Sequence, residues 1–145
     1  MNQYVLDANI LFSGLLSQKA IYRVLFSKHT FHTPDFVLAE LNNYRTVLLK
    51  KSAVKGTDLK AFTLALFAHI IVVPDYVITT ESYERATALV ADIDPKDVAY
   101  VALSIELNAV LLTRDKPLYE GLLAKGYEHV QLFSDFIYQQ TANSN

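Results

Sequence analysis

The feature that most constrains the fold is a series of short strand-like runs, several of them apolar throughout, separated by longer helical segments. A strand that is apolar at every position is buried on both faces, which is typical of a parallel sheet covered by helices. The chain is therefore predicted to be an α/β protein with three layers and a central parallel sheet of about five strands. The expected strands cover residues 4–6, 30–32, 70–73, 109–112 and 130–132.

Helical segments fill the spaces between these strands. One of them is expected to begin at Pro34 with Thr33 as its N-cap, because Thr caps well and Pro suits the first helical position. The helices expected are residues 10–26 in two pieces around Gly14 and Ser17, 34–51, 57–69 capped by Thr57 after a Lys55-Gly56 turn, 80–91, 95–108, 117–125, and a short one capped by Ser134. Residues 1–140 are expected to form one domain and residues 141–145 a flexible C-terminal tail.

Composition excludes several classes of protein. With 52% apolar and 19% charged residues, the chain is not intrinsically disordered. It has no cysteine, which excludes disulfides, thiolate metal sites and a cysteine nucleophile, and which fits a reducing cytoplasm. No apolar run is long enough to span a bilayer, and no basic region precedes an apolar stretch at the N-terminus, so a cytoplasmic protein without a signal peptide is expected. The net charge of −2 gives no basic footprint for nucleic acid.

Acidic residues stand where such a fold places ligands. In parallel α/β sheets, ligands bind at the carboxyl ends of the strands. Asp7 follows the first expected strand directly, and Asp115 comes three residues after the fourth. Glu40 lies on the apolar stripe of its helix, between Phe36 and Tyr44, where a charge is costly unless it is paired or bound to a metal.

Each acid also has an ordinary structural explanation. Asp7 and Asp115 are suited to cap the helices that follow them. Glu40 is suited to pair with a Lys or Arg at the edge of its stripe. Asp97 is the third residue of a helix that Asp94 is suited to cap, where an acid favours the helix dipole. Asp94 is in turn an alternative to Asp97 in any metal site.

Taken together, the four acids suggest a cluster. Carboxylates that are brought close repel each other, so a protein keeps them together mainly to hold a hard cation. Without cysteines or a paired-histidine motif, Mg²⁺ or Mn²⁺ is the expected ion. Such an ion activates water and stabilises the charge that develops on a phosphodiester. Asn9 and Thr113, each two residues from one of the strand-end acids, are suited to orient a carboxylate or a metal-bound water.

With these residues in this order, the sequence resembles the PIN domain family of metal-dependent ribonucleases. The resemblance covers nearly the whole chain and rests on residues 5–11 (VLDANIL), Glu40, residues 94–104 (DPKDVAYVALS) and residues 111–118 (LLTRDKPL). It implies a Rossmann-like sheet with strand order 3-2-1-4-5. It also implies a site in which Asp7, Glu40, Asp97 and Asp115 hold Mg²⁺ or Mn²⁺ and hydrolyse an RNA phosphodiester.

The resemblance also implies roles for other residues and partners. Arg114 and Lys116 flank Asp115, where they either contact phosphate or are ordinary solvated charges. Asn9 and Thr113 would support the metal ligands. Many small members of this family are VapC-type toxins, each neutralised by a small antitoxin and often dimeric, so an antitoxin and a homodimer are expected here.

Two other functions stay open. One is a PIN-like RNA-binding or assembly module that keeps the acids without turnover. The other is a phosphotransferase of the haloacid dehalogenase type, which needs a second Asp two residues after the first, where this chain has Asn9. The stripes around Tyr22 and Phe62 are core candidates, or else dimer or antitoxin surfaces. The basic cluster of Lys50, Lys51, Lys55 and Lys60 is a solvated face or a rim that attracts RNA, and a zinc pair of His29 and His32 is not expected.

Overall fold

A parallel five-stranded sheet forms the centre of the molecule. The computed structural model describes residues 2–51 and 56–143. Every neighbouring pair of strands is parallel, and the order is β3-β2-β1-β4-β5, which confirms the predicted class and strand order. The strands are β1 (Gln3–Leu6), β2 (Thr30–Pro34), β3 (Ile70–Val73), β4 (Val110–Thr113) and β5 (Val130–Leu132).

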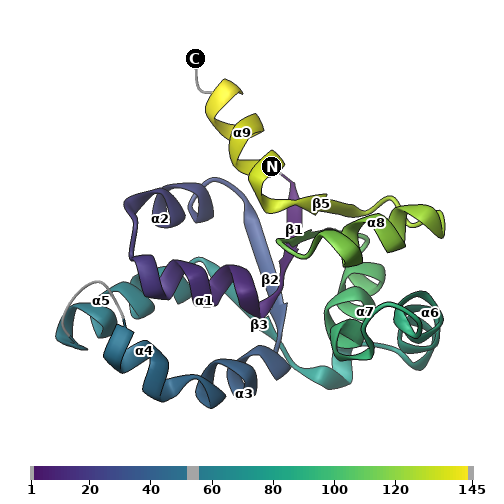
Figure 1. Cartoon of the computed structure of the whole chain (residues 1–145), viewed down its shortest axis with the longest axis horizontal. Helices are drawn as coiled ribbons and strands as arrows, with labels where there is room; N and C mark the ends of the chain where they lie inside the picture. Colours follow the sequence, from purple (N-terminus) through teal and green to yellow (C-terminus); the bar gives the residue numbers. More distant parts are fainter. Residues whose placement is uncertain (1, 52–55, 144–145) are drawn as a thin grey trace.

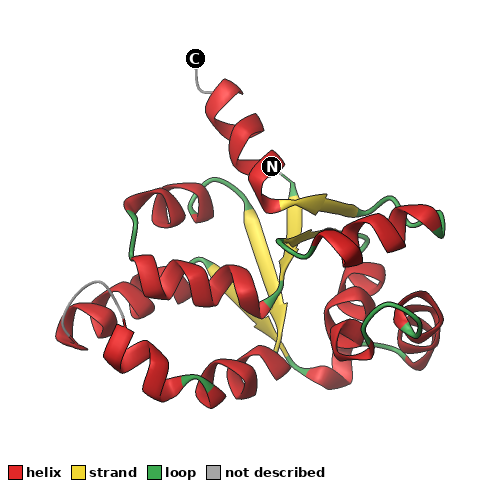
Figure 2. Ribbon diagram, viewed as in Figure 1, coloured by secondary structure: helices red, strands yellow, loops and turns green. Residues whose placement is uncertain are grey.

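Helices cover both faces of this sheet. Figure 1 shows α1 and α2 on one side of it and α6 and α7 on the other, and Figure 2 shows the strands enclosed between helical layers. Helix α7 packs against β1, β2 and β4, and α6 packs outside α7. The helices are α1 (Ala8–Ser17), α2 (Ala20–Phe26), α3 (Phe36–Asn43), α4 (Arg45–Lys51), α5 (Gly56–Phe67), α6 (Thr80–Val90), α7 (Val98–Leu107), α8 (Lys116–Ala124) and α9 (Phe133–Asn143), with 3₁₀ turns η1 (Asp75–Val77) and η2 (Pro95–Asp97).

The central strand β1 and its neighbour β4 are largely buried in the middle of the sheet. Val5 of β1 pairs with His32 of β2 and Leu111 of β4, and neither Val5 nor Leu111 has any exposed surface. The expected core stripes are confirmed as core, because Tyr22 and Phe62 are both buried. Among the described residues, no helix is both long and apolar enough to cross a membrane.

The structure corrects the predicted start of the third helical segment. Thr33 is not a helix cap but a buried residue of β2, and its hydroxyl donates a hydrogen bond to the Leu6 carbonyl, 3.0 Å away. Pro34 ends the strand opposite Val73, and α3 begins only at Phe36. Residues 33 and 34 extend the strand instead of starting a helix for two reasons. Pro at the last strand position has no N–H that would be left unpaired, and Thr is as well suited to a strand as to a helix cap.

Two expected helical segments break at places that the sequence marked only roughly. The first breaks at Gln18, which has a left-handed backbone (φ 51°), so Gly14 lies inside α1. The segment expected to run from 34 to 51 is divided at Tyr44, whose ring packs on Phe12 with 5.1 Å between centroids. The break at Tyr44 separates α3 from α4, and each of these two helices packs against α1.

Smaller differences concern the helix ends. Helix α5 begins at Gly56, so Thr57 lies inside it, and Lys55 of the expected turn falls outside the described residues. Helix α9 begins one residue before Ser134 and continues to Asn143, whereas a tail was expected from Thr141. Residues 144 and 145 fall outside the described part of the chain.

Candidate functional site

Asp7 is held at the carboxyl end of the central strand by hydrogen bonds to both of its oxygens. It caps α1, where Oδ1 accepts from the backbone N–H of Ile10 at 3.1 Å. Oδ2 accepts from the Thr113 hydroxyl at 2.8 Å. Only 4% of Asp7 is exposed, and this burial raises the pKa of its carboxyl to about 6, against the lowering effect of the hydrogen bonds.

Thr113 connects Asp7 to the second strand-end acid. Its hydroxyl, fully buried at the end of β4, also accepts a hydrogen bond from the Asp115 backbone N–H at 3.1 Å. Asp115 caps α8 through Oδ1, which accepts from the Leu118 N–H at 3.1 Å. The capping explanation is therefore correct for both Asp7 and Asp115. The same two caps also bring two carboxylates to neighbouring strand ends.

Asp97 is different, because its carboxylate caps nothing. It occupies the N-cap position of α7 without a side-chain cap bond, and Asp94 caps the preceding turn through the Lys96 N–H at 3.0 Å. Among the described residues, Asp97 Oδ2 is buried without a hydrogen-bond partner. Burial first, and then the charges of Asp94, Asp7, Asp115 and Glu40, raise the pKa of Asp97 to about 7. The expected placement is therefore correct, with Asp94 as the cap and Asp97 at the third position, but the Asp97 side chain makes no capping bond.

Glu40 completes the set from α3. The buried Tyr100 of α7 donates its phenolic hydrogen bond to Glu40 Oε1. Within the described residues no Lys or Arg forms an ion pair with Glu40, so that explanation of its position fails. The burial of Tyr100 and the neighbouring Glu40 raise the pKa of the phenol. We call Asp7, Glu40, Asp97 and Asp115 the acid cluster.

The supporting residues expected from the sequence divide into those near the acid cluster and those turned elsewhere. Thr113 and Asp94 act on it, as described above. Asn9 contributes through its backbone N–H, which lowers the pKa of Asp7, while its side chain is exposed. Arg114 points instead towards α2 and α9, where its guanidinium donates to the Tyr22 hydroxyl at 2.8 Å. Lys116 is exposed on the first turn of α8.

Sequence reasoning missed two tyrosines that contact functional candidates. Tyr100 is one helical turn from Asp97 on α7, and Tyr22 reaches Arg114 from α2. The only available signal was a Tyr placed close behind Asp97 in an otherwise aliphatic run. Their partners are 60 and 92 residues away in the chain, so the pairing depends on the tertiary fold.

The acid cluster offers the donor atoms that a hard cation prefers, but its carboxylates are not arranged as a complete set of metal ligands. Its donors are all carboxylates, and the unpartnered Oδ2 of Asp97 lies among charges of its own sign. In residues 2–51 and 56–143, no group of three or more acidic, His or Cys side chains is placed so that it could hold a metal ion. The carboxylates thus interact electrostatically, and binding an ion requires them to draw closer.

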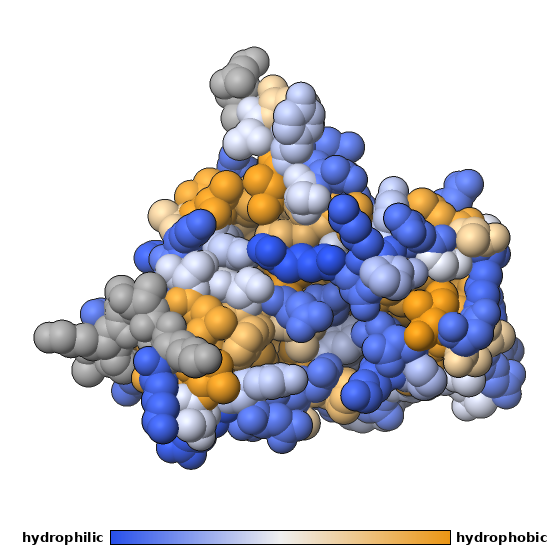
Figure 3. Space-filling model, in the orientation of Figure 1, coloured by the Kyte–Doolittle hydropathy of each residue, from blue (hydrophilic) through white to orange (hydrophobic). Residues whose placement is uncertain are grey.

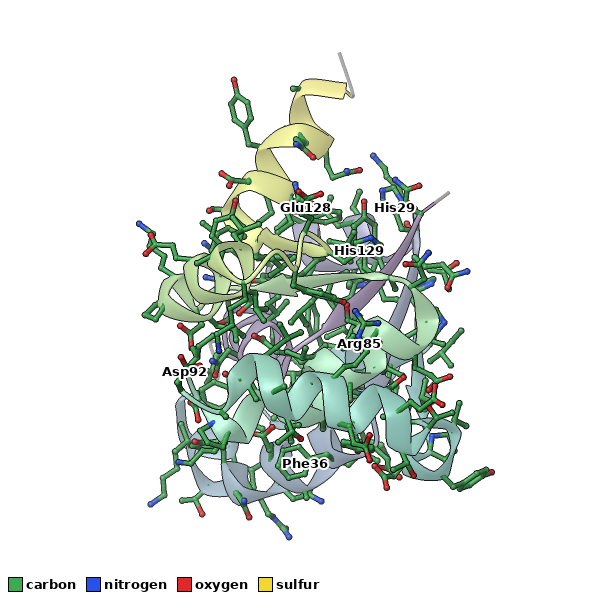
Figure 4. The ribbon with its side chains drawn as sticks, turned by 90° about the vertical axis from the view of Figure 1, so that its right-hand side faces the viewer. His29, Phe36, Arg85, Asp92, Glu128 and His129 are labelled. Atoms are coloured by element: carbon green, nitrogen blue, oxygen red, sulfur yellow. The ribbon has the colours of Figure 1, made fainter. Side chains whose placement is uncertain are left out.

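Three of the four histidines, His29, His69 and His129, directly precede strands, at the edge of the sheet opposite to the acids. Figure 4 shows His29 and His129 in the upper half of the view, well above Phe36, the residue that begins α3. His29 faces the rings of Tyr4 and Phe136, and its Nε2 lies 2.8 Å from Gln140 Oε1. This placement leaves the carboxylates as the candidate ligands at the strand ends.

The fold and the site together define a class: a parallel three-layer α/β protein with acids at the carboxyl ends of its central strands. The PIN domain family model matches residues 5–134, and the chain belongs to this family. No curated protein matches it.

Solved structures of similar fold include chains from two toxin–antitoxin complexes. One is VapBC2 from Rickettsia felis, bound to a DNA fragment from its promoter, with 18% identity, a TM-score of 0.61, and coverage of 90% of this chain and 96% of that one. The other is a toxin–antitoxin complex from Klebsiella pneumoniae, with 15% identity, a TM-score of 0.60, and coverage of 88% and 95%. At these identities the likeness establishes the shared fold.

Proposed function

We propose that the chain is a metal-dependent endoribonuclease that hydrolyses RNA phosphodiester bonds at the acid cluster. The observation that carries this proposal is the buried Oδ2 of Asp97, which has no hydrogen-bond partner among the described residues and feels the charges of the other three carboxylates and of Asp94. A buried carboxylate without a partner is costly when it is charged, and a bound cation would compensate that charge. Mg²⁺ or Mn²⁺ matches an all-carboxylate donor set, and membership of the PIN family fits the same chemistry.

The residues divide the work by how firmly each is held. Asp7 is fixed by Thr113 and the first turn of α1, so it supplies an immobile ligand oxygen. Asp97 and Asp115 approach from the starts of α7 and α8 as the other ligands. Glu40, oriented by Tyr100, is placed to bind the ion directly or through water, or to take a proton from the attacking water. When bound, Mg²⁺ supplies a Lewis acid for a phosphate oxygen and a water of lowered pKa.

We propose further that this nuclease is the toxin of a type II toxin–antitoxin pair, acting in the cytoplasm as a homodimer and neutralised by a small antitoxin. The support is its PIN domain and the fold that it shares with chains of two solved toxin–antitoxin complexes. Expression in a bacterial host should arrest growth, and co-expression of the protein encoded next to it should restore growth. Normal growth of cells that contain the soluble, RNA-cleaving protein would contradict the toxin assignment.

One observation favours a second function, an RNA-binding or assembly module without turnover. No group of three ligands is already arranged around an ion site in the described residues. Such a module would bind RNA, and even metal, without cutting. The cleavage experiment therefore has to separate binding from hydrolysis.

The decisive experiment incubates purified protein with total cellular RNA in Mg²⁺ or Mn²⁺, and in parallel with EDTA. Cleavage that requires the metal and disappears in both Asp7→Asn and Asp115→Asn establishes the nuclease, and sequencing of the new ends identifies its target. Asp58→Asn on α5 is the matched control, because Asp58 is exposed and outside the acid cluster. Metal binding and RNA binding without any cleavage would overturn the nuclease in favour of the module.

A further inference from the structure

A small cavity lies beside the acid cluster, at the carboxyl ends of β4 and β5. Its volume is about 240 Å³. Its polar wall is formed by Thr113, Arg114, Lys116 and Ser134, and its apolar wall includes Leu132. Two of these side chains are cations and none is an acid, since Asp135 on the same turn as Ser134 does not line the cavity. The polar wall of the cavity is therefore suited to an anion, while Leu132, Phe133 and Ile137 form an apolar wall and both cations are exposed to solvent.

The guanidinium in this cavity is held in place by aromatic groups rather than by an acid. Arg114 Nη2 donates to the Tyr22 hydroxyl at 2.8 Å, and its Cζ lies 5.1 Å from the centroid of the Phe133 ring. Both rings are buried, and they stack on each other with 5.9 Å between centroids. We call Tyr22, Arg114 and Phe133 the arginine clamp. It joins α2, the turn after β4, and α9.

The arginine clamp leaves the charge of Arg114 available. Within the described residues, no carboxylate forms an ion pair with Arg114, although Asp115 follows it directly in the sequence. A guanidinium has five N–H donors in one plane, and the Tyr22 contact uses only one of its nitrogens. An oriented guanidinium beside a second cation matches the geometry of a phosphate, which accepts two parallel hydrogen bonds.

The position of the cavity relates this anion to the proposed reaction. Thr113 lines the cavity and also donates to Asp7, so the two sites share a wall. Arg114 and Lys116 flank Asp115, and consecutive Cα atoms are about 3.8 Å apart. Figure 3 shows hydrophilic side chains gathered around the point where α1 and α8 begin. A surface of this kind is compatible with a bound RNA backbone, which is polar and charged.

We propose that this cavity is a subsite for a backbone phosphate of the RNA that neighbours the scissile one. Arg114 and Lys116 bind that phosphate, and Tyr22 is a positioning residue that sets the plane of the guanidinium. The inference rests on the proposed ribonuclease function and adds how the strand is held. It also explains why a chain with a net charge of −2 needs no extended basic surface, because two cations act at one point.

The test measures binding of RNA that is not being cut. In EDTA, with Asp7→Asn as the background, the affinity for a labelled single-stranded 20-mer is measured by fluorescence anisotropy over a range of salt concentrations. Arg114→Gln is expected to weaken binding about tenfold and to reduce the slope of log K against log salt by about 0.7, the value for one phosphate contact on a single strand. Tyr22→Phe keeps the charge, so it is expected to weaken binding about threefold with the slope unchanged.

The matched control is Arg85→Gln. Arg85 is exposed on α6, on the face that Figure 4 presents. The substitution therefore removes one positive charge, as Arg114→Gln does, but at a position that does not line the cavity. Unchanged affinity and slope in Arg114→Gln, with normal thermal unfolding, would overturn the subsite, and so would an equal loss in Arg85→Gln. Weaker binding of an Asp- and Glu-rich peptide with unchanged RNA binding would instead assign the cavity to a protein partner. The two proposals can fail separately. If the wild-type protein does not cleave RNA in the presence of metal but Arg114→Gln still lowers the salt slope, the nuclease proposal is contradicted and the phosphate subsite is supported.

Discussion

Two of the four acids in the cluster accept hydrogen bonds from the backbone, and for the other two no backbone donor is found among the described residues. Asp7 and Asp115 accept backbone hydrogen bonds as helix caps, which favour their charged forms and fix their orientation. Asp97 and Glu40 have no such backbone partner; Glu40 has the Tyr100 hydroxyl, and Asp97 Oδ2 has none among the described residues. Asp7 and Asp115 therefore form a rigid part of the site. Without a bound ion, the unpartnered oxygen of Asp97 lowers the stability of the protein at pH values where this carboxyl is ionised.

The raised pKa of Asp97 leads to a prediction about stability and pH. An unfolded Asp loses its proton near pH 3.9, whereas folded Asp97 keeps it up to about pH 7. Between these values the folded state binds more protons, so stability without metal falls as the pH rises from about 4 to about 7. Asp97→Asn removes this loss, and because Asp97 is partly exposed the gain at pH 8 should be about 1–2 kcal/mol.

Urea unfolding in EDTA at pH 5 and pH 8 checks this difference. The wild type should lose more stability between the two values than Asp97→Asn does. Asp58→Asn, an exposed acid on α5, should follow the wild type. An Asp97→Asn protein with the wild-type dependence on pH would show that the carboxyl is not desolvated as described.

Tyr100 leads to a second prediction about a single residue. Its hydroxyl is the group that orients Glu40, and the ring itself is 2% exposed. Tyr100→Phe keeps the packing and removes one hydrogen bond to a charged group, so we expect a loss of about 2 kcal/mol in stability and a larger fractional loss of RNA cleavage. Urea denaturation and cleavage rates measure the two effects. Tyr119→Phe is the control, and equal activity in Tyr100→Phe and wild type would show that Glu40 needs no positioning.

At the scale of helices and strands, local signals predicted what lies where and tertiary contacts decided the boundaries. The strands ending before Asp7 and Asp115 were predictable, because an apolar run followed by a capping acid is visible in a few residues. Thr33 and Pro34 were not, because Thr33 bonds to Leu6 of another strand, and a helix cap and a strand end look alike in one dimension. The break at Tyr44 likewise depends on Phe12, 32 positions earlier in the sequence.

The contact between α1 and α2 gives a prediction at this scale. Gly14 lies inside α1, and a Cβ there would be 3.0 Å from Cδ1 of the Tyr22 ring. That ring cannot retreat, because it stacks on Phe133 and meets Phe26 edge-on. Gly14→Ala should therefore destabilise the protein by about 1 kcal/mol, even though Ala favours a helix over Gly by about the same amount.

The same substitution should disturb the arginine clamp, since Tyr22 holds Arg114. Thermal unfolding measures the stability, with Ser13→Ala on the same helix as the control, expected within about 0.5 kcal/mol of the wild type. Salt-dependent RNA binding measures the clamp. A Gly14→Ala protein more stable than the wild type would mean that the α1–α2 contact is loose enough to absorb a methyl group.

At the scale of the whole molecule, the site exists only because distant segments converge. Asp7 and its partner Thr113 are 106 residues apart, and Glu40 and Tyr100 are 60 apart. The sequence identified Asp7 and Asp115 through the rule that places ligands at strand ends, which needs only the order of elements. Glu40 was found through its place on an apolar stripe, and Asp97 only together with the other acids and the resemblance to the PIN family. It did not place the side chain of Arg114, because a charge beside Asp115 is as easily paired with that acid as turned to an aromatic ring.

This convergence makes metal binding a test of the whole fold. An ion held by α1, α7 and α8 binds the folded state alone, and at a hundred times its Kd it adds about 2.7 kcal/mol of stability, or about 10 °C in Tm. At pH 5 the increase in Tm should be smaller, because this pH lies below the pKa values of Asp97 (about 7) and Asp7 (about 6). Both carboxyls are then mostly protonated, and protons compete with the metal ion. Thermal unfolding with Mn²⁺, against Na⁺ at equal ionic strength, measures it. Asp97→Asn should lose most of the shift, whereas a full shift in that variant would place the ion elsewhere in the molecule.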